Sequence, residues 1–138
     1  MSEPRIITMG QGSASKHKPE ARTICISIRS PASPVPEFQP GYVDILFLEF
    51  EDDCWDDWQT RDKGMTPDQG DQVARFVEKN RGKFEIILVH CFVGASRSVS
   101  MAMALAMELL IHYPGWPSRV PNRNVYVTTR QAFKAVAA

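Results

Sequence analysis

Residues 84–113 read FEIILVHCFVGASRSVSMAMALAMELLIHY. This stretch is the strongest indication of the fold in the sequence. Residues 84–89 are mostly apolar and partly β-branched, which is typical of a buried strand. Residues 99–113 are apolar almost all round and long enough for a buried helix, which Pro114 and Gly115 would end. The stretch therefore predicts a strand, a short loop and a helix in direct succession.

Outside this stretch, apolar β-branched runs alternate with helical patterns. The expected strands are 6–9, 23–28 and 43–50. Thr66, Pro67 and Gln69 form a capping box that predicts the start of a helix. Residues 10–20 read as a loop or weak helix, 30–41 as a proline-rich connection, and 128–137 as a closing helix. This alternation predicts an α/β fold, with a central mixed β-sheet flanked by helices.

The composition favours a single domain over residues 1–138, with 43% hydrophobic and 23% charged residues. Sixteen basic residues balance sixteen acidic ones, so no general basic field indicates nucleic-acid binding. The sequence has neither an apolar run of about 18 residues nor an apolar N-terminal segment. Three cysteines, an odd number, do not suggest a secreted disulfide framework. We therefore expect a cytoplasmic, monomeric domain that binds neither nucleic acid nor membrane.

The candidate chemistry lies in residues 90–98, HCFVGASRS, where the predicted strand passes into the predicted helix. Backbone N–H groups of such a loop and the helix dipole together favour a bound anion such as phosphate or sulfate. The same groups stabilise a thiolate at Cys91 and can lower its pKa from about 8.5 to roughly 3.5–7.5. The planar guanidinium of Arg97 matches two oxygens of a phosphate. The loop thus joins a nucleophile to a phosphate-binding group.

The HCxxGxSRS pattern resembles the signature of the cysteine-dependent protein tyrosine phosphatase superfamily, and most of all its dual-specificity phosphatases. The resemblance covers roughly residues 43–113. It implies a protein tyrosine phosphatase-like fold and a metal-independent hydrolase with no cofactor. The expected substrate is phosphotyrosine in a protein or peptide, with phosphoserine and phosphothreonine left open.

The resemblance also implies a role for each residue of the loop. Cys91 would attack phosphorus and form a cysteinyl-phosphate intermediate. Ser98 would hydrogen-bond the sulfur, and His90 would orient the loop through its backbone without touching the substrate. The phosphate oxygens would be held by Phe92, Val93, Gly94, Ala95, Ser96 and Arg97.

In this family an aspartate that follows the preceding strand protonates the leaving oxygen. The segment after strand 43–50 is rich in aspartate. Asp52 is the first candidate, because Phe50-Glu51-Asp52 at the end of the apolar run is where the family places its acid; Asp53 is the second and Asp57 the third. Most of the other aspartates in this segment are expected to be solvated surface residues.

Several alternatives remain open at this stage. The domain could bind phosphate without turnover, or use the same chemistry on a phosphoinositide or an RNA 5′-phosphate. The variable loop positions hold Phe92, Val93 and Ala95, which add no basic residue and favour a phosphoprotein. A reversible disulfide of Cys91 with Cys25 or Cys54 would protect the thiolate from oxidation. No histidine and cysteine spacing suggests a metal site.

Overall fold

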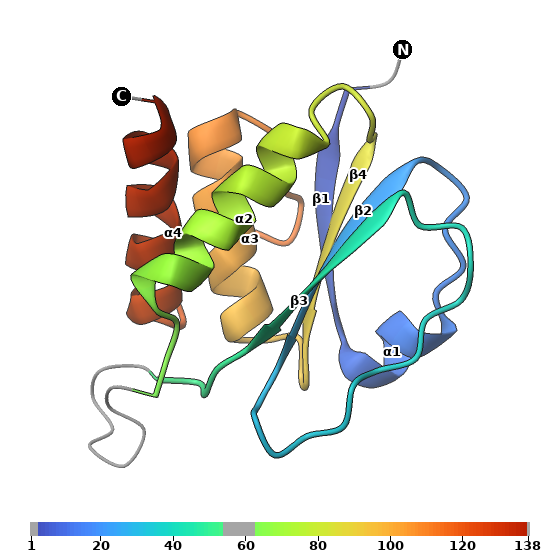
Figure 1. Ribbon diagram of the computed structural model, residues 1–138, viewed down its shortest axis with the longest axis horizontal. Helices are drawn as coiled ribbons and strands as arrows, with labels where there is room; N and C mark the ends of the chain where they lie inside the picture. Colours follow the sequence, from blue (N-terminus) through green and yellow to red (C-terminus); the bar gives the residue numbers. More distant parts are fainter. Residues whose placement is uncertain (1–2, 54–62, 138) are drawn as a thin grey trace.

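Four strands form the central sheet, in the order β1-β4-β2-β3 (Figure 1). The computed structural model describes residues 3–53 and 63–137. The strands are β1 (Arg5–Gly10), β2 (Thr23–Arg29), β3 (Asp44–Glu49) and β4 (Ile86–Cys91). All three strand pairings are parallel, whereas the sequence analysis expected a mixed sheet. The α/β class is confirmed.

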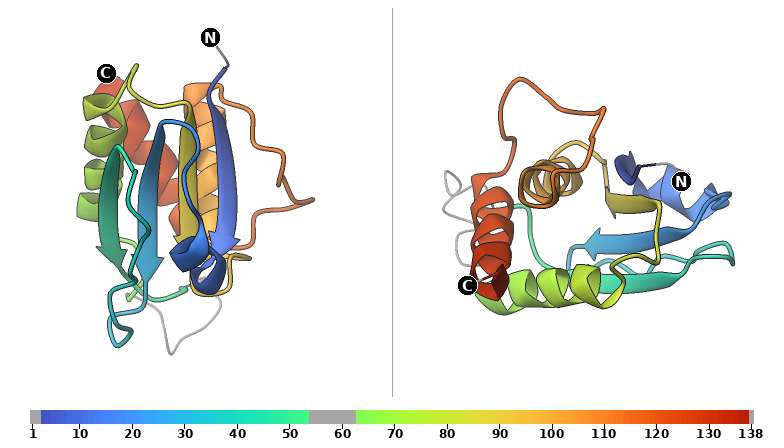
Figure 2. Two further views of the ribbon diagram at one scale, coloured as in Figure 1. Left: turned by 90° about the vertical axis from the view of Figure 1, so that its right-hand side faces the viewer. Right: turned by 90° about the horizontal axis from the view of Figure 1, so that it is seen from above.

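The helices are α1 (Gln11–Lys16), α2 (Pro67–Lys79), α3 (Arg97–Leu109) and α4 (Arg123–Ala137). Figures 1 and 2 show α2, α3 and α4 together on one face of the sheet, with α4 packed against both others. The short α1 lies on the opposite side, at the end of β1. No helix in the described ranges combines the length and apolar character needed to cross a bilayer.

The core lies between the sheet and the three large helices. Residues 23–28 of β2 are all buried, and the alternate residues Ile24, Ile26 and Ile28 belong to this core, which matches the period of two in the sequence. On α2 the capping box is formed as predicted: the Thr66 hydroxyl accepts from the Gln69 amide, and the Gln69 side chain accepts from the Thr66 amide. The helix then buries its apolar stripe in the same core.

Three elements begin or end at least two residues from the predicted position. β4 runs on to Cys91, two residues past the predicted end. α3 begins at Arg97 and ends at Leu109, because Leu110 adopts the left-handed conformation (φ 55°) and the chain then pairs with β1 through His112. α4 begins at Arg123, five residues before the predicted start.

Candidate active site

The candidate site lies where the carboxyl ends of the parallel strands meet, the usual location of ligand sites in open α/β sheets. Cys91 is the last residue of β4, and the loop 92–96 connects it to the first residue of α3 (Figure 1). Ser30 follows β2 directly, and Phe50 follows β3. The fold therefore brings three strand ends to the loop that the sequence singled out.

The loop packs tightly against the end of β1. The amide of Gln11 donates to the carbonyl of Phe92 at 3.0 Å, so the planar trans peptide turns the Val93 N–H to the opposite side. Gly94 has φ 84°, and a Cβ there would lie 2.5 Å from the Gly10 nitrogen. Both the backbone conformation and the lack of space require glycine at position 94.

Cys91 is buried as a residue, with 2% of its surface exposed, and its sulfur is hydrogen-bonded by the loop. The amide of Gly94 donates to Sγ at 3.2 Å, and the Ser98 hydroxyl lies 3.2 Å from Sγ. Burial raises the pKa of the thiol, but hydrogen bonds from Ser98 and Gly94 and the charge of Arg97 outweigh burial, so the pKa lies below its usual value. This geometry stabilises the nucleophilic form of cysteine.

Arg97 is 6% exposed and is anchored by two strand ends. Its Nη1 donates to the Phe50 carbonyl at 2.7 Å and to the Ser30 hydroxyl at 3.1 Å. Both bonds use Nη1, so neither of them involves the edge formed by Nε and Nη2. Sequence reasoning missed both anchors. A backbone carbonyl such as that of Phe50 cannot be recognised from residue type, and the only indication for Ser30 was its position shortly after a predicted strand.

The imidazole of His90 is fully buried beneath the loop. Its Nε2 lies 2.6 Å from the Ser27 hydroxyl, and its Nδ1 lies 3.3 Å from the Cys91 carbonyl. Burial lowers the pKa of His90, the charge of Arg97 lowers it further, and the Cys91 carbonyl opposes them. The ring is therefore neutral at pH 7 and contacts backbone, as the sequence analysis expected of its position.

Asp52 reaches the loop from the end of β3. Its Oδ1 accepts from the Ser96 hydroxyl at 2.8 Å and from the side-chain amide of Asn122 at 2.6 Å. Ser96 occupies the N-cap of α3, but its hydroxyl makes no capping bond and binds Asp52 instead. The carboxylate is therefore hydrogen-bonded directly to the loop that contains Cys91.

The other candidate acids are placed differently. Asp53 is 2% exposed and faces inward. It packs so closely on Gly64 that a Cβ added to this glycine would lie 2.6 Å from the Cβ of Asp53. This position favours Asp52 over Asp53 as the acid that meets solvent and substrate. Asp57 and Cys54 lie outside the described residues.

Asn122 is a site residue to which sequence reasoning gave no role. It is fully buried, its backbone amide donates to Ser100 at 2.8 Å, and its Oδ1 accepts from the Val125 amide at 3.0 Å. Asn122 thus caps α4 while its side-chain amide holds Asp52. The available signal was Pro121-Asn122, a turn pair just before a helix.

The position of Cys25 does not allow a disulfide with Cys91. Cys25 pairs with Leu88, three positions before Cys91 on β4. Three strand residues span about 10 Å and place the two side chains on opposite faces, beyond the reach of a disulfide. Burial also raises the pKa of Cys25 to about 12, which keeps this thiol protonated and unreactive.

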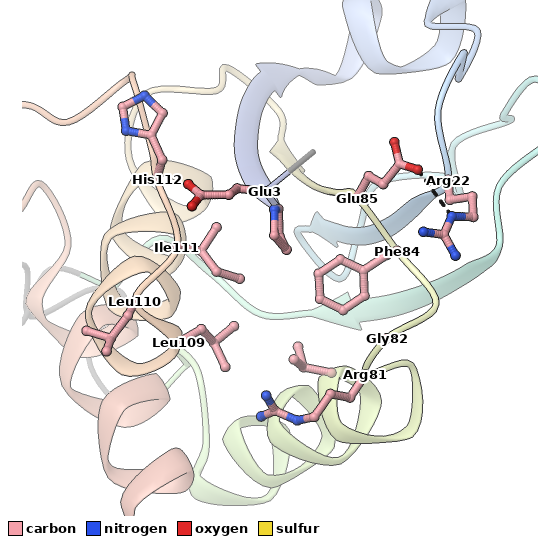
Figure 3. A pocket seen from close by; sticks show the side chains of 12 residues that line it. Glu3, Arg22, Arg81, Gly82, Phe84, Glu85, Leu109, Leu110, Ile111 and His112 are labelled. Carbon is pink, nitrogen blue, oxygen red and sulfur yellow. Dashed lines mark hydrogen bonds and ion pairs between the residues drawn. The ribbon is translucent and has the colours of Figure 1, made fainter. Parts of the chain in front are cut away.

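A separate cavity of about 400 Å³ lies at the other end of the strands, beside the residues that precede β1, β2 and β4 (Figure 3). Its floor is apolar, with Phe84, Leu109 and Ile111, and Arg22 and Glu85 form an ion pair at its rim. The cavity does not border the loop of Cys91. It therefore adds nothing to the candidate active site.

The arrangement suits nucleophilic attack on a small tetrahedral anion, with a stabilised sulfur, a guanidinium and a carboxylate around one loop. Among residues 3–53 and 63–137, no group of three or more histidine, cysteine or acidic side chains is arranged to hold a metal ion. Comparison with models of known protein families and with curated proteins finds no match to this chain.

Proposed function

We propose that this chain is a metal-independent phosphomonoester hydrolase that dephosphorylates phosphotyrosine in proteins, and that it is a dual-specificity phosphatase-like member of the protein tyrosine phosphatase superfamily. One observation carries the proposal. The Cys91 sulfur accepts a hydrogen bond from Gly94 and lies 3.2 Å from the Ser98 hydroxyl, in a loop that ends at Arg97. A structural cysteine needs no such donors.

In the first step the Cys91 thiolate attacks phosphorus. An S–P bond forms as the P–O bond to the substrate breaks. Arg97 and the loop amides stabilise the charge on the three equatorial oxygens. Asp52, protonated at the start, donates its proton to the departing oxygen.

In the second step water attacks the cysteinyl-phosphate. Asp52, now a carboxylate, accepts the proton of that water, the S–P bond breaks and inorganic phosphate leaves. The Ser98 hydroxyl stabilises the sulfur as it becomes a thiolate again. Each residue thereby returns to its starting protonation state.

The rim of the loop supports a substrate with an apolar body. Phe92 is 64% exposed and Val93 is 73% exposed, and neither carries charge. Such a rim suits an aromatic ester of phosphate better than a phosphoinositide or an RNA end, whose added phosphates favour basic residues. Phosphoserine and phosphothreonine remain candidate substrates. A reducing compartment such as the cytoplasm would keep Cys91 in its active thiol form.

The test is hydrolysis of p-nitrophenyl phosphate in excess chelator, followed by a panel of phosphotyrosine, phosphothreonine, phosphoinositide and 5′-phosphorylated RNA substrates. We expect turnover with chelator present and preference for phosphotyrosine. Binding of a phosphotyrosine peptide without any turnover would instead establish a phosphate-binding module.

A further inference from the structure

Ser27 and His90 form a buried polar pair beneath the loop. They are partners in the register of β2 and β4, and both side chains are fully buried. The Ser27 hydroxyl lies 2.6 Å from His90 Nε2, and the Phe38 and His90 rings make an edge-type contact with their centroids 5.5 Å apart. A buried hydroxyl at this distance from a ring nitrogen fixes how that ring is hydrogen-bonded.

The contacts determine which ring nitrogen of His90 holds the proton. The ring is neutral, so it has one donor and one acceptor nitrogen. Nδ1 lies 3.3 Å from the Cys91 carbonyl, which only accepts, so Nδ1 is the donor. Nε2 is then the acceptor, and the Ser27 hydroxyl donates to it.

This tautomer fixes the first peptide of the loop. With the Cys91 carbonyl held by Nδ1–H, the planar trans peptide directs the Phe92 N–H to the opposite side. The direction of that amide and the placement of Cys91 therefore depend on the imidazole. The imidazole in turn depends on the hydroxyl that satisfies Nε2.

We propose that Ser27 is a positioning residue for the nucleophile, acting through His90 on the backbone of Cys91. This inference rests on the proposed function, but it concerns the reactivity of the thiol and needs no turnover to be tested. Without the hydroxyl, Nε2 is buried with an unsatisfied lone pair, which favours the other tautomer or a rotated ring. Either change releases the Cys91 carbonyl.

The experiment measures the rate at which iodoacetamide alkylates Cys91 between pH 5 and 9, with the site mapped by mass spectrometry. We expect Ser27→Ala to slow alkylation at pH 6 roughly threefold to tenfold, about the effect of one hydrogen bond. Ser27→Thr, which keeps a hydroxyl, should retain the wild-type profile. A Ser27→Ala profile that superimposes on the wild type overturns the inference.

Thr23→Ala is the matched control. Thr23 lies on the same face of the same strand, is fully buried, and donates its hydroxyl to the Ala21 carbonyl at 2.9 Å. Deleting this hydroxyl removes a part-buried hydrogen bond from the same strand, at the end far from the loop. The alkylation profile should not change, although the protein is destabilised.

A double-mutant cycle with His90→Asn tests the route of action. The asparagine amide retains a donor near the Cys91 carbonyl but does not reach Ser27. Adding Ser27→Ala to His90→Asn should therefore change the profile no further, and additive effects overturn the inference. If wild-type Cys91 is no more reactive at pH 6 than an ordinary thiol, the proposed function itself fails, which is a different outcome.

Discussion

Asn122 donates a 2.6 Å hydrogen bond to Asp52, from the start of α4 to the segment that follows β3. The same asparagine caps α4 through Val125, so the orientation of the candidate acid is tied to a helix terminus. Ser96 holds the same carboxylate oxygen from the loop of Cys91. The acid is thereby held by a buried asparagine at the start of α4 and by a serine of the loop, which lie far apart in the sequence.

Cys91→Ser should abolish turnover and keep, or strengthen, the binding of an oxyanion. The loop amides and Arg97 remain, while the serine hydroxyl is not ionised at neutral pH. Hydrolysis of p-nitrophenyl phosphate and calorimetric binding of tungstate measure the two properties. Multiple turnover by this variant would contradict a covalent mechanism.

Asp52→Asn should slow hydrolysis of phenyl phosphate by about 10²–10⁴-fold, because the leaving oxygen is no longer protonated. It should spare 2,4-dinitrophenyl phosphate, whose leaving group needs no proton. Asp53→Asn is the comparison and should reduce stability without this leaving-group dependence, since Asp53 faces inward. The reverse pattern would make Asp53 the acid.

Asn122→Ser should separate capping from catalysis. Serine remains a good N-cap for α4 but is too short to reach Asp52. We expect kcat for phenyl phosphate to fall by about tenfold, comparable to losing one hydrogen bond, with a small change in Tm. An unchanged kcat would show that the Asn122 side chain is not needed to orient the acid.

Gly94→Ala should abolish both oxyanion binding and turnover. Its Cβ would meet the backbone of Gly10 at 2.5 Å, and its φ of 84° adds strain of about 1–2 kcal/mol. Gly82→Ala is a matched control, because Gly82 has φ 80° with nothing within 4 Å of the added Cβ. It should lower the free energy of unfolding by a similar strain but leave activity intact, as chemical denaturation and kinetics can verify.

His90 should make the protein less stable as the pH falls. Its pKa in the folded state lies below 6.5, so below pH 6.5 the unfolded chain takes up a proton that the folded protein does not. The free energy of unfolding then decreases with falling pH, by at most about 1.4 kcal/mol per pH unit, until the folded-state pKa is reached. Denaturation midpoints between pH 5 and 7 measure this slope, and His90→Asn should reduce it.

The parts of the site that the sequence could predict are local. Residues 90–98 are contiguous, so their strand, loop and helix follow from hydrophobic pattern and spacing, and the structure places Cys91, Arg97 and Ser98 around one loop. Ser30 and Asn122 had only a local signal, from a strand end and a turn, and Ser27 had none. Their contacts with the site could not be predicted, because each residue comes from a distant segment and depends on how the elements pack.

Two fold details were wrong for similar reasons. Strand direction depends on how connections cross the sheet, so a fully parallel sheet could not be distinguished from a mixed one by hydrophobic pattern. The end of α3 depends on Leu110 in a left-handed conformation that leucine rarely adopts. Neither feature has a signal in residue type.

The contact of Gly94 with Gly10 has a consequence for how the motif is used as a marker. Nine consecutive residues suffice to find it in a genome, but the backbone on which the loop rests is contributed from some eighty positions upstream. A fragment that begins after residue 10 contains every residue of the motif and lacks that support. The loop geometry on which the proposed catalysis depends would therefore require the first strand as well as the nine residues of the motif.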